Sequence, residues 1–383
     1  MKKREISLVK RRMKGDKSTS TAVYGYYVTP SGEIISSFNL HPGRMDENEQ
    51  TAYFDILRQV LDCHIGNHSF LIPIHSEEQK EKQKTLLDAL EHDLKDDDSR
   101  GALVKSIIDG YESSTNYLIL LDFETMDLVR KRGRSAKDDA DDSDRVFRYY
   151  VCAICPVTQG KEELSYTTDK EEFHNRSLGS VAEKPLAGFM FPTLEDESRN
   201  VNEVMFYAKK FSRADERFLL QTFGHRHAIQ TQEQTRETFA DILSSTMGDN
   251  CTIDFVSNMS KAVREMMTAA AIEAKASKDE KEEFQLGREE LSSCLTSGGA
   301  TAKEAKEVVS ACEERLGSLS ETSPESLLNT SNCMIQMEGC TVKVDASLSN
   351  KVSLKIVDGA RYIMIRADGE EVTINGIPVR ESM

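Results

Sequence analysis

Tyr-Leu-Ile-Leu-Leu at residues 117–121 and Phe-Arg-Tyr-Tyr-Val-Cys-Ala-Ile-Cys-Pro-Val at residues 147–157 are continuous, mainly apolar runs of strand length. Such runs are typical of strands covered on both faces, because a strand with one exposed face alternates apolar and polar residues. We therefore predict that the two runs are neighbours in a central sheet. Residues 21–28 and 33–40 flank a Pro-Ser-Gly turn and predict a hairpin.

Helices are predicted where apolar residues recur every three or four positions after a capping residue. A D-x-x-E pattern at Asp46 predicts the start of one helix, and Ser99 is expected to cap another. Ser212 is expected to begin a further helix, which Gly224 ends. Together with the strands, these helices predict a mixed α/β body with a central sheet over residues 1–230.

The pattern changes twice after residue 230. Only helical periodicity is found as far as residue 328, and the last fifty residues then alternate with a period of two. Asp-Gly and Asn-Gly pairs at residues 358–359, 368–369 and 375–376 favour tight hairpin turns. The sequence thus predicts an α+β protein in three parts: the α/β body (1–230), a helical segment (231–328) and a small C-terminal antiparallel β meander (329–383).

One segment of the body has no pattern of a packed element. Basic residues 130–134 are followed at once by five aspartates between residues 138 and 144. A segment so charged and so poor in apolar residues cannot form a core. We predict a mobile charged loop near residues 130–145.

The charge of the chain bears on its partners. Its 383 residues include 65 acidic and 49 basic side chains, a formal net charge of −16, which repels phosphate backbones and disfavours nucleic acid. Residues 1–14 are the exception, with seven basic side chains and one acid. Because Ile6, Val9 and Met13 fall near one helical face, a docked amphipathic helix is favoured over a nucleic-acid contact there.

The sequence also bears on the compartment. No apolar stretch approaches the roughly 18 residues of a membrane span, and the N-terminus lacks the apolar part of a signal peptide. We therefore expect no membrane span and a cytoplasmic location. Eight cysteines without an export signal are interpreted as reduced thiols.

Asp122-Phe123-Glu124-Thr125 follows the first apolar run and is a candidate metal motif. Carboxylates two residues apart at a strand end can converge on a divalent cation, and the pattern is similar to the first motif of proofreading-type exonucleases. The partner motifs are missing, since Gln230 stands where the late motif beginning at His225 needs an aspartate. A metal-dependent nuclease or phosphodiesterase using Asp122 and Glu124 is therefore an alternative and not the leading hypothesis.

Other candidate residues are interpreted as structural. Cys152 and Cys155 have C-x-x-C spacing, but strand residues three apart point to opposite faces, which separates the thiols. The histidines at positions 174, 225 and 227 provide no second ligand pair for zinc. Phosphate-loop, dinucleotide-binding, nucleophile-elbow and zinc-protease motifs are absent from the sequence. We expect no cofactor and no bound metal, and we assign no catalytic residue.

Several segments in order resemble a bacterial domain-of-unknown-function family, number 4317. They are the basic N-terminal helix, the 117–121 run, residues 150–157, 164–166 and 188–192, and the turn within residues 372–379. The resemblance implies an intracellular bacterial protein and brings no catalytic assignment with it. The order of segments is also similar to the layout of bacterial nucleoid-associated proteins.

These observations favour a non-enzymatic binding or scaffold protein that acts through its surfaces. Its expected partner is another protein, or a second copy bound through residues 329–383. The alternatives are a nucleoid-associated-type accessory protein that contacts nucleic acid through the basic N-terminus, and the metal-dependent enzyme described above.

Overall fold

The computed structural model divides the chain into two compact units, Met1–Ile229 and Gln230–Met383. It describes residues 1–14, 17–128, 146–160, 162–167, 172–177, 179–196, 198–227, 229–276, 284–316, 323–330, 332–345, 348, 351–367, 372–374 and 377–379. The charged loop predicted near residues 130–145 lies outside the described residues.

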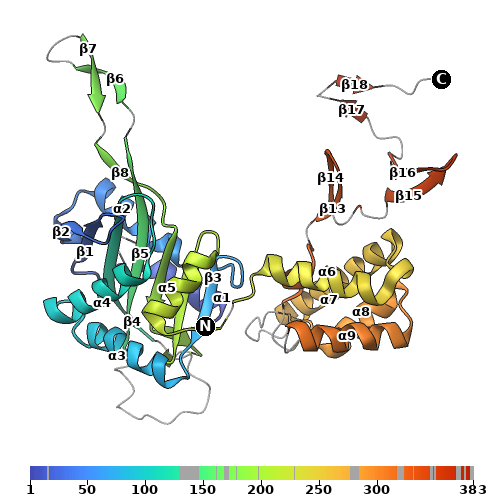
Figure 1. The fold of residues 1–383 in the computed structure, drawn as a ribbon, viewed down its shortest axis with the longest axis horizontal. Helices are drawn as coiled ribbons and strands as arrows, with labels where there is room; N and C mark the ends of the chain where they lie inside the picture. The colour runs from blue at the N-terminus through green and yellow to red at the C-terminus, as the bar shows by residue number, and fades with distance from the viewer. Residues whose placement is uncertain are drawn as a thin grey trace. The chain divides into compact units, whose positions relative to one another are not determined.

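The first unit is built on a central sheet, as predicted, and the strand pairs of this sheet are antiparallel (Figure 1). The two apolar runs lie side by side in β4 and β5, with Leu120 opposite Ala153. The predicted N-terminal hairpin is β1 and β2, and it pairs with the free side of β4. Strand β8 pairs with the end of β5. From one edge to the other, the order is β2 (Ile34–Leu40), β1 (Val23–Val28), β4 (Tyr117–Asp127), β5 (Val146–Gln159), β9 (Ala187–Phe191), β12 (Glu203–Ala208) and β3 (Ser69–Pro73), with β8 at Ser180–Ala182.

Helices cover both faces of this sheet, which explains the continuous apolar runs in its central strands β4 and β5 (Figure 1). One face packs on α1 (Lys3–Arg12) and α2 (Glu47–Val60). The other packs on α3 (Glu77–Glu91), α4 (Asp97–Gly110) and α5 (Arg213–Phe223). Two short hairpins, β6–β7 and β10–β11, extend from the sheet; their strands are Glu162–Thr167, Glu172–Ser177, Thr193–Glu195 and Ser198–Asn200.

The capping residues were predicted with one error. Asp46 accepts hydrogen bonds from the backbone N–H groups of Asn48 and Glu49 at 2.9 and 2.8 Å, so α2 begins as expected. The prediction for Ser99 was wrong, because α4 begins two residues earlier and Asp96 caps it. The carboxylate of Asp96 accepts a hydrogen bond from the backbone N–H of Ser99 at 2.8 Å. Because Asp96, Asp97 and Asp98 are consecutive, the sequence did not show which residue was the cap.

The second unit contains the predicted helices and C-terminal strands. Helices α6 (Gln232–Met247), α7 (Ile253–Ala276), α8 (Arg288–Gly298), α9 (Ala302–Leu316) and α10 (Pro324–Leu327) share a separate apolar core. Two 3-10 turns, η1 (Pro42–Arg44) and η2 (Gly248–Asn250), complete the helices of the two units.

The C-terminal strands form hairpins and not one continuous meander. Each described strand pairs only with its hairpin partner. The pairs are β13 (Asn332–Met337) with β14 (Cys340–Asp345), β15 (Val352–Val357) with β16 (Ala360–Ile365), and β17 (Val372–Ile374) with β18 (Ile377–Val379). Asp358 and Gly359 both have positive φ, 50° and 81°, as the predicted tight turn requires. The other two predicted turns lie in residues the structure does not describe.

Candidate functional site

Asp122 and Glu124 lie on the same face of β4, in the interior of the first unit. Their side chains are 0% and 1% exposed. Because alternate strand residues share a face, both point with Leu120 and Met126 toward the side covered by α1 and α2. The two carboxylates share a face, as their spacing of two residues indicates, but the expectation that they lie at a strand end was wrong, because β4 continues to Asp127.

The segment Ser18–Ser20 caps the two carboxylates with hydroxyl groups. The Ser18 and Ser20 hydroxyls donate to Glu124 and Asp122, respectively. Thr19 donates twice to Oε2 of Glu124, from its backbone N–H at 2.7 Å and from its hydroxyl at 2.6 Å. The cap lies more than one hundred residues before Asp122 and Glu124, so no local sequence signal revealed it.

Two polar atoms at this site have no hydrogen-bond partner. They are Oδ2 of Asp122 and the hydroxyl of Tyr149, which is fully buried. Tyr149 lies on β5 directly opposite Glu124. A buried polar atom without a partner costs roughly 1–3 kcal/mol, so this arrangement needs a physical reason.

Burial and mutual repulsion govern the charges at this site. Burial, followed by the neighbouring charge of Glu124, raises the pKa of Asp122 well above its usual range. Burial also raises the pKa of Glu124, and the hydroxyls and N–H groups of the cap oppose this shift. The pKa of Tyr149 is raised by burial and then by both carboxylates, and Arg12 opposes the rise. The largest causes of the two carboxylate shifts include no lysine or arginine among the described residues.

The histidines do not join this pair. His225 follows α5 on the opposite face of the sheet, where its Nδ1 lies 3.4 Å from Nε2 of Gln79. The ring of His227 stacks edge-on against His225, and the side chain of His174 is outside the described residues. Among the described residues, no three His, Cys, Asp or Glu side chains gather as metal ligands. The adjacency of Asp122 and Glu124 supports the nuclease alternative, but among the described residues no third His, Cys, Asp or Glu ligand joins them. The alternative stays a prediction.

Cys152 and Cys155 occupy opposite faces of β5, as strand alternation predicts. Cys152 is in the core beneath α3–α5, and Cys155 is in the core beneath α1 and α2. Burial raises the pKa of Cys152 well above its usual range and that of Cys155 to about 12. Neither thiol has the lowered pKa of a reactive cysteine.

The basic N-terminal segment forms helix α1, which docks through its apolar residues. Ile6, Val9 and Met13 are fully buried against the sheet, while Arg11 and Arg12 are exposed. The docked helix was the favoured interpretation, and contact with nucleic acid through the exposed basic side chains stays a prediction.

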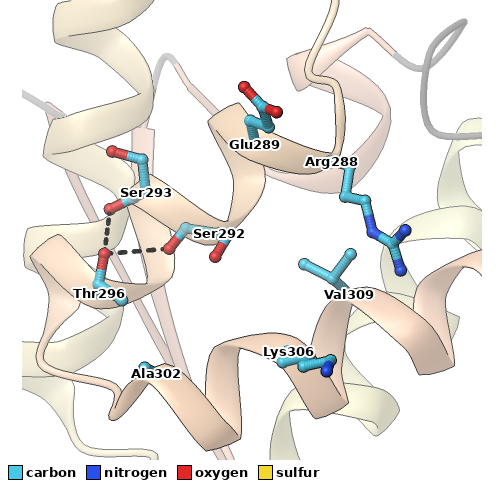
Figure 2. Close-up of a pocket in the computed structure, with 8 residues that line it drawn as sticks. All are labelled: Arg288, Glu289, Ser292, Ser293, Thr296, Ala302, Lys306 and Val309. Carbon is cyan, nitrogen blue, oxygen red and sulfur yellow. Dashed lines mark hydrogen bonds between the residues drawn. The ribbon is translucent and has the colours of Figure 1, made fainter.

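Sequence reasoning did not find a groove between α8 and α9 (Figure 2). Its volume is about 570 Å³. Two of the polar side chains on its walls have partners: Arg288 pairs with Glu313 at 3.1 Å, and the Thr296 hydroxyl donates to carbonyl groups of its own helix. The lining residues are Arg288, Glu289, Ser292, Ser293, Thr296, Ala302, Lys306 and Val309.

Two C-terminal hairpins, β13–β14 and β15–β16, each have a face on which apolar side chains gather, and in β15–β16 the opposite face also carries exposed Val357, Tyr362 and Met364. In β15–β16, the cross-strand pairs Val352–Ile365 and Leu354–Ile363 share a face with Ile356. In β13–β14 the corresponding face holds Cys333 with Val344, Ile335 with Val342, and Met337 with Cys340. We call these two surfaces the apolar hairpin faces.

The fold defines an α+β protein with a helix-covered antiparallel sheet and a second unit of helices and hairpins. A family model described as a domain of unknown function (DUF4317) matches residues 1–377, and the chain belongs to this family. No curated protein and no solved structure matches it significantly. Within the described residues, the helices include none of the length and apolar character needed to cross a membrane.

Proposed function

We propose that the chain is a non-enzymatic binding protein that assembles with a second copy of itself through the apolar hairpin faces. The exposure of these faces carries the proposal. Leu354, Ile356 and Ile365 are 48%, 72% and 53% exposed. An isolated two-stranded hairpin is marginally stable in water, so a face of this kind gains stability by packing on another apolar surface.

A second copy is the partner that these faces suit best. A twofold contact places the same surface of two chains together, so each face finds a partner of equal length and apolar character. Charge supports this choice. Two chains with a net charge of −16 repel each other, but residues 332–366 contain five basic and three acidic side chains. The hairpins are therefore where two copies can approach with little of that repulsion.

The test is the mass of the full chain in solution, measured by size-exclusion chromatography with light scattering. One chain has a mass of 43.0 kDa, so a twofold assembly has about twice this mass. The double variant Leu354→Asn/Ile356→Asn places amides on the apolar face of β15 and is expected to elute as a monomer.

The matched control changes the opposite face of the same strand. Ser353→Asn/Lys355→Asn keeps the apolar face intact and is expected to retain the mass of the assembly. A wild-type monomer at tens of micromolar would contradict the proposal, and so would an unchanged mass for the apolar-face variant.

A further inference from the structure

The buried pair Asp122 and Glu124 presents an electrostatic problem that the protein atoms around it do not solve. Both side chains are almost fully buried, and the groups that hydrogen-bond to them are the hydroxyls and N–H groups of residues 18–20. These donors are uncharged. A buried carboxylate without a counter-charge is costly, and two adjacent ones are more costly still.

The oxygen atoms around the pair suit a hard cation. Two carboxylates and the hydroxyls of Ser18 and Ser20 meet beside the middle of β4. The Ser20 hydroxyl donates to Asp122 and keeps its lone pairs for a metal ion, and the Ser18 hydroxyl keeps one because it also accepts the backbone N–H of Ser20 at 3.1 Å. The Thr19 hydroxyl is not counted as a ligand, because it accepts from the N–H and the hydroxyl of Thr125. Cations such as Ca²⁺ and Mg²⁺ are held in proteins by carboxylate, hydroxyl and carbonyl oxygens of this kind.

Two buried oxygen atoms that lack a hydrogen-bond partner are a second observation in favour of a bound cation. Oδ2 of Asp122 makes no hydrogen bond and is inaccessible to solvent. The hydroxyl of Tyr149, on the adjacent strand opposite Glu124, is likewise buried without a partner. Tyr149 and Glu124 are cross-strand neighbours on the face covered by α1 and α2, so their side chains lie on the same side of the sheet. A bound ion would give both orphaned oxygens a partner.

We propose that Asp122 and Glu124, with the Tyr149 hydroxyl and the Ser18–Ser20 cap, bind one divalent cation, and that Ca²⁺ is preferred. The charge of +2 on the ion balances the charge of −2 on the two ionised carboxylates. Ca²⁺ accepts six to eight oxygen ligands with flexible geometry, whereas Mg²⁺ demands near-ideal octahedral geometry and gives up its waters reluctantly, which disfavours Mg²⁺ at carboxylates that are almost fully buried. Thr19 is exposed, so one layer of side chains separates the carboxylates from solvent and defines the route of entry.

The site is independent of the apolar hairpin faces, because it lies in the first unit. Its function in the full chain is to hold the cap, and with it the loop that joins α1 to β1, against β4. Binding is expected to stabilise the first unit and leave the mass of the assembly unchanged.

The experiment measures thermal unfolding of the full chain, stripped with EDTA and then titrated with CaCl₂, MgCl₂ or MnCl₂ at pH 7.5. At a Ca²⁺ concentration 100 times the Kd, one occupied site raises the Tm by roughly 5–10 °C. Calorimetric titration is expected to give one ion per chain, with Ca²⁺ bound more tightly than Mg²⁺.

Three variants locate the ion. Asp122→Asn and Glu124→Gln are expected to lose the Ca²⁺-induced rise in Tm. Tyr149→Phe removes one oxygen ligand and is expected to weaken Ca²⁺ binding about tenfold. Tyr150→Phe is the matched control, because the Tyr150 hydroxyl lies on the opposite face near the carbonyl of Leu86 and should not affect the shift. No shift with any of the three cations, or a full shift in Asp122→Asn, would overturn the proposal and leave a shared proton as the means of neutralisation.

Discussion

The pH dependence of stability gives a direct measure of how the buried carboxylates are neutralised in the absence of metal. The folded pKa of Asp122 is raised above its value in the unfolded chain, which is about 3.9. Between these two values the folded protein keeps a proton that the unfolded chain releases. The free energy of unfolding must therefore fall as the pH rises, by about 1.4 kcal/mol per pH unit for each such proton. Over two pH units that lie between these two values, this amounts to roughly 2.7 kcal/mol for Asp122 alone.

Asp122→Asn removes this titration and keeps an oxygen that can accept the hydrogen bond from Ser20. We therefore expect the variant to lose less stability than the wild type between pH 5 and pH 7, and to be the more stable protein at pH 7 in EDTA. Glu124 also has a raised pKa, so part of the slope remains.

The assay is urea unfolding at four pH values from 5 to 8, followed by circular dichroism. Asp109→Asn on the exposed side of α4 controls for the change in net charge and should follow the wild type. If the Asp122→Asn and wild-type profiles run parallel over this range, Asp122 keeps its charge in the folded protein and the reasoning is refuted.

Two further predictions concern the sheet. A Cβ atom on Gly188 would lie 2.4 Å from the carbonyl oxygen of Cys152 and 2.7 Å from Val60. Gly188→Ala is therefore expected to lower the Tm by roughly 5–10 °C. Gly43→Ala is the control and should leave the Tm nearly unchanged, because a Cβ atom there meets nothing within 4 Å. Scanning calorimetry decides this, and equal Tm values would contradict the close packing of α2 on β9. Iodoacetamide is expected to label exposed Cys340 within minutes and to reach Cys152 and Cys155 only after unfolding, because both are buried with raised pKa values. Mass spectrometry of peptides from the native protein would disprove this if Cys152 were labelled first.

Local and periodic signals were enough to predict much of the architecture. The apolar runs in β4 and β5 identified the centre of the sheet, because only strands covered on both faces lack polar alternation. The alternation after residue 330 predicted the C-terminal strands, and Gly359 predicted a turn with positive φ. The same signals could not show that the hairpins remain separate, since pairing between hairpins depends on contacts that the alternation does not specify.

The candidate site was only half accessible from the sequence. Asp122 and Glu124 were identified because two residues on one strand with a spacing of two must share a face. The sequence did not identify Ser18, Ser20 and Tyr149, because their proximity to the two carboxylates depends on strand order and register. A Ser-Thr-Ser run has many uses in a loop, and nothing local distinguishes a cap over carboxylates from a solvated turn.

The strand order also determines when strand β3 can pair during synthesis on the ribosome. Strand β3 ends at Pro73, yet its neighbour in the sheet, β12, begins at Glu203, 130 residues later. At 5–20 residues per second, translation of this interval takes roughly 6 to 26 s. Throughout that time Phe70 and Ile72, which become fully enclosed, have no strand to pair with, so the nascent chain depends on α2, α3 and any chaperone present to keep them from aggregating.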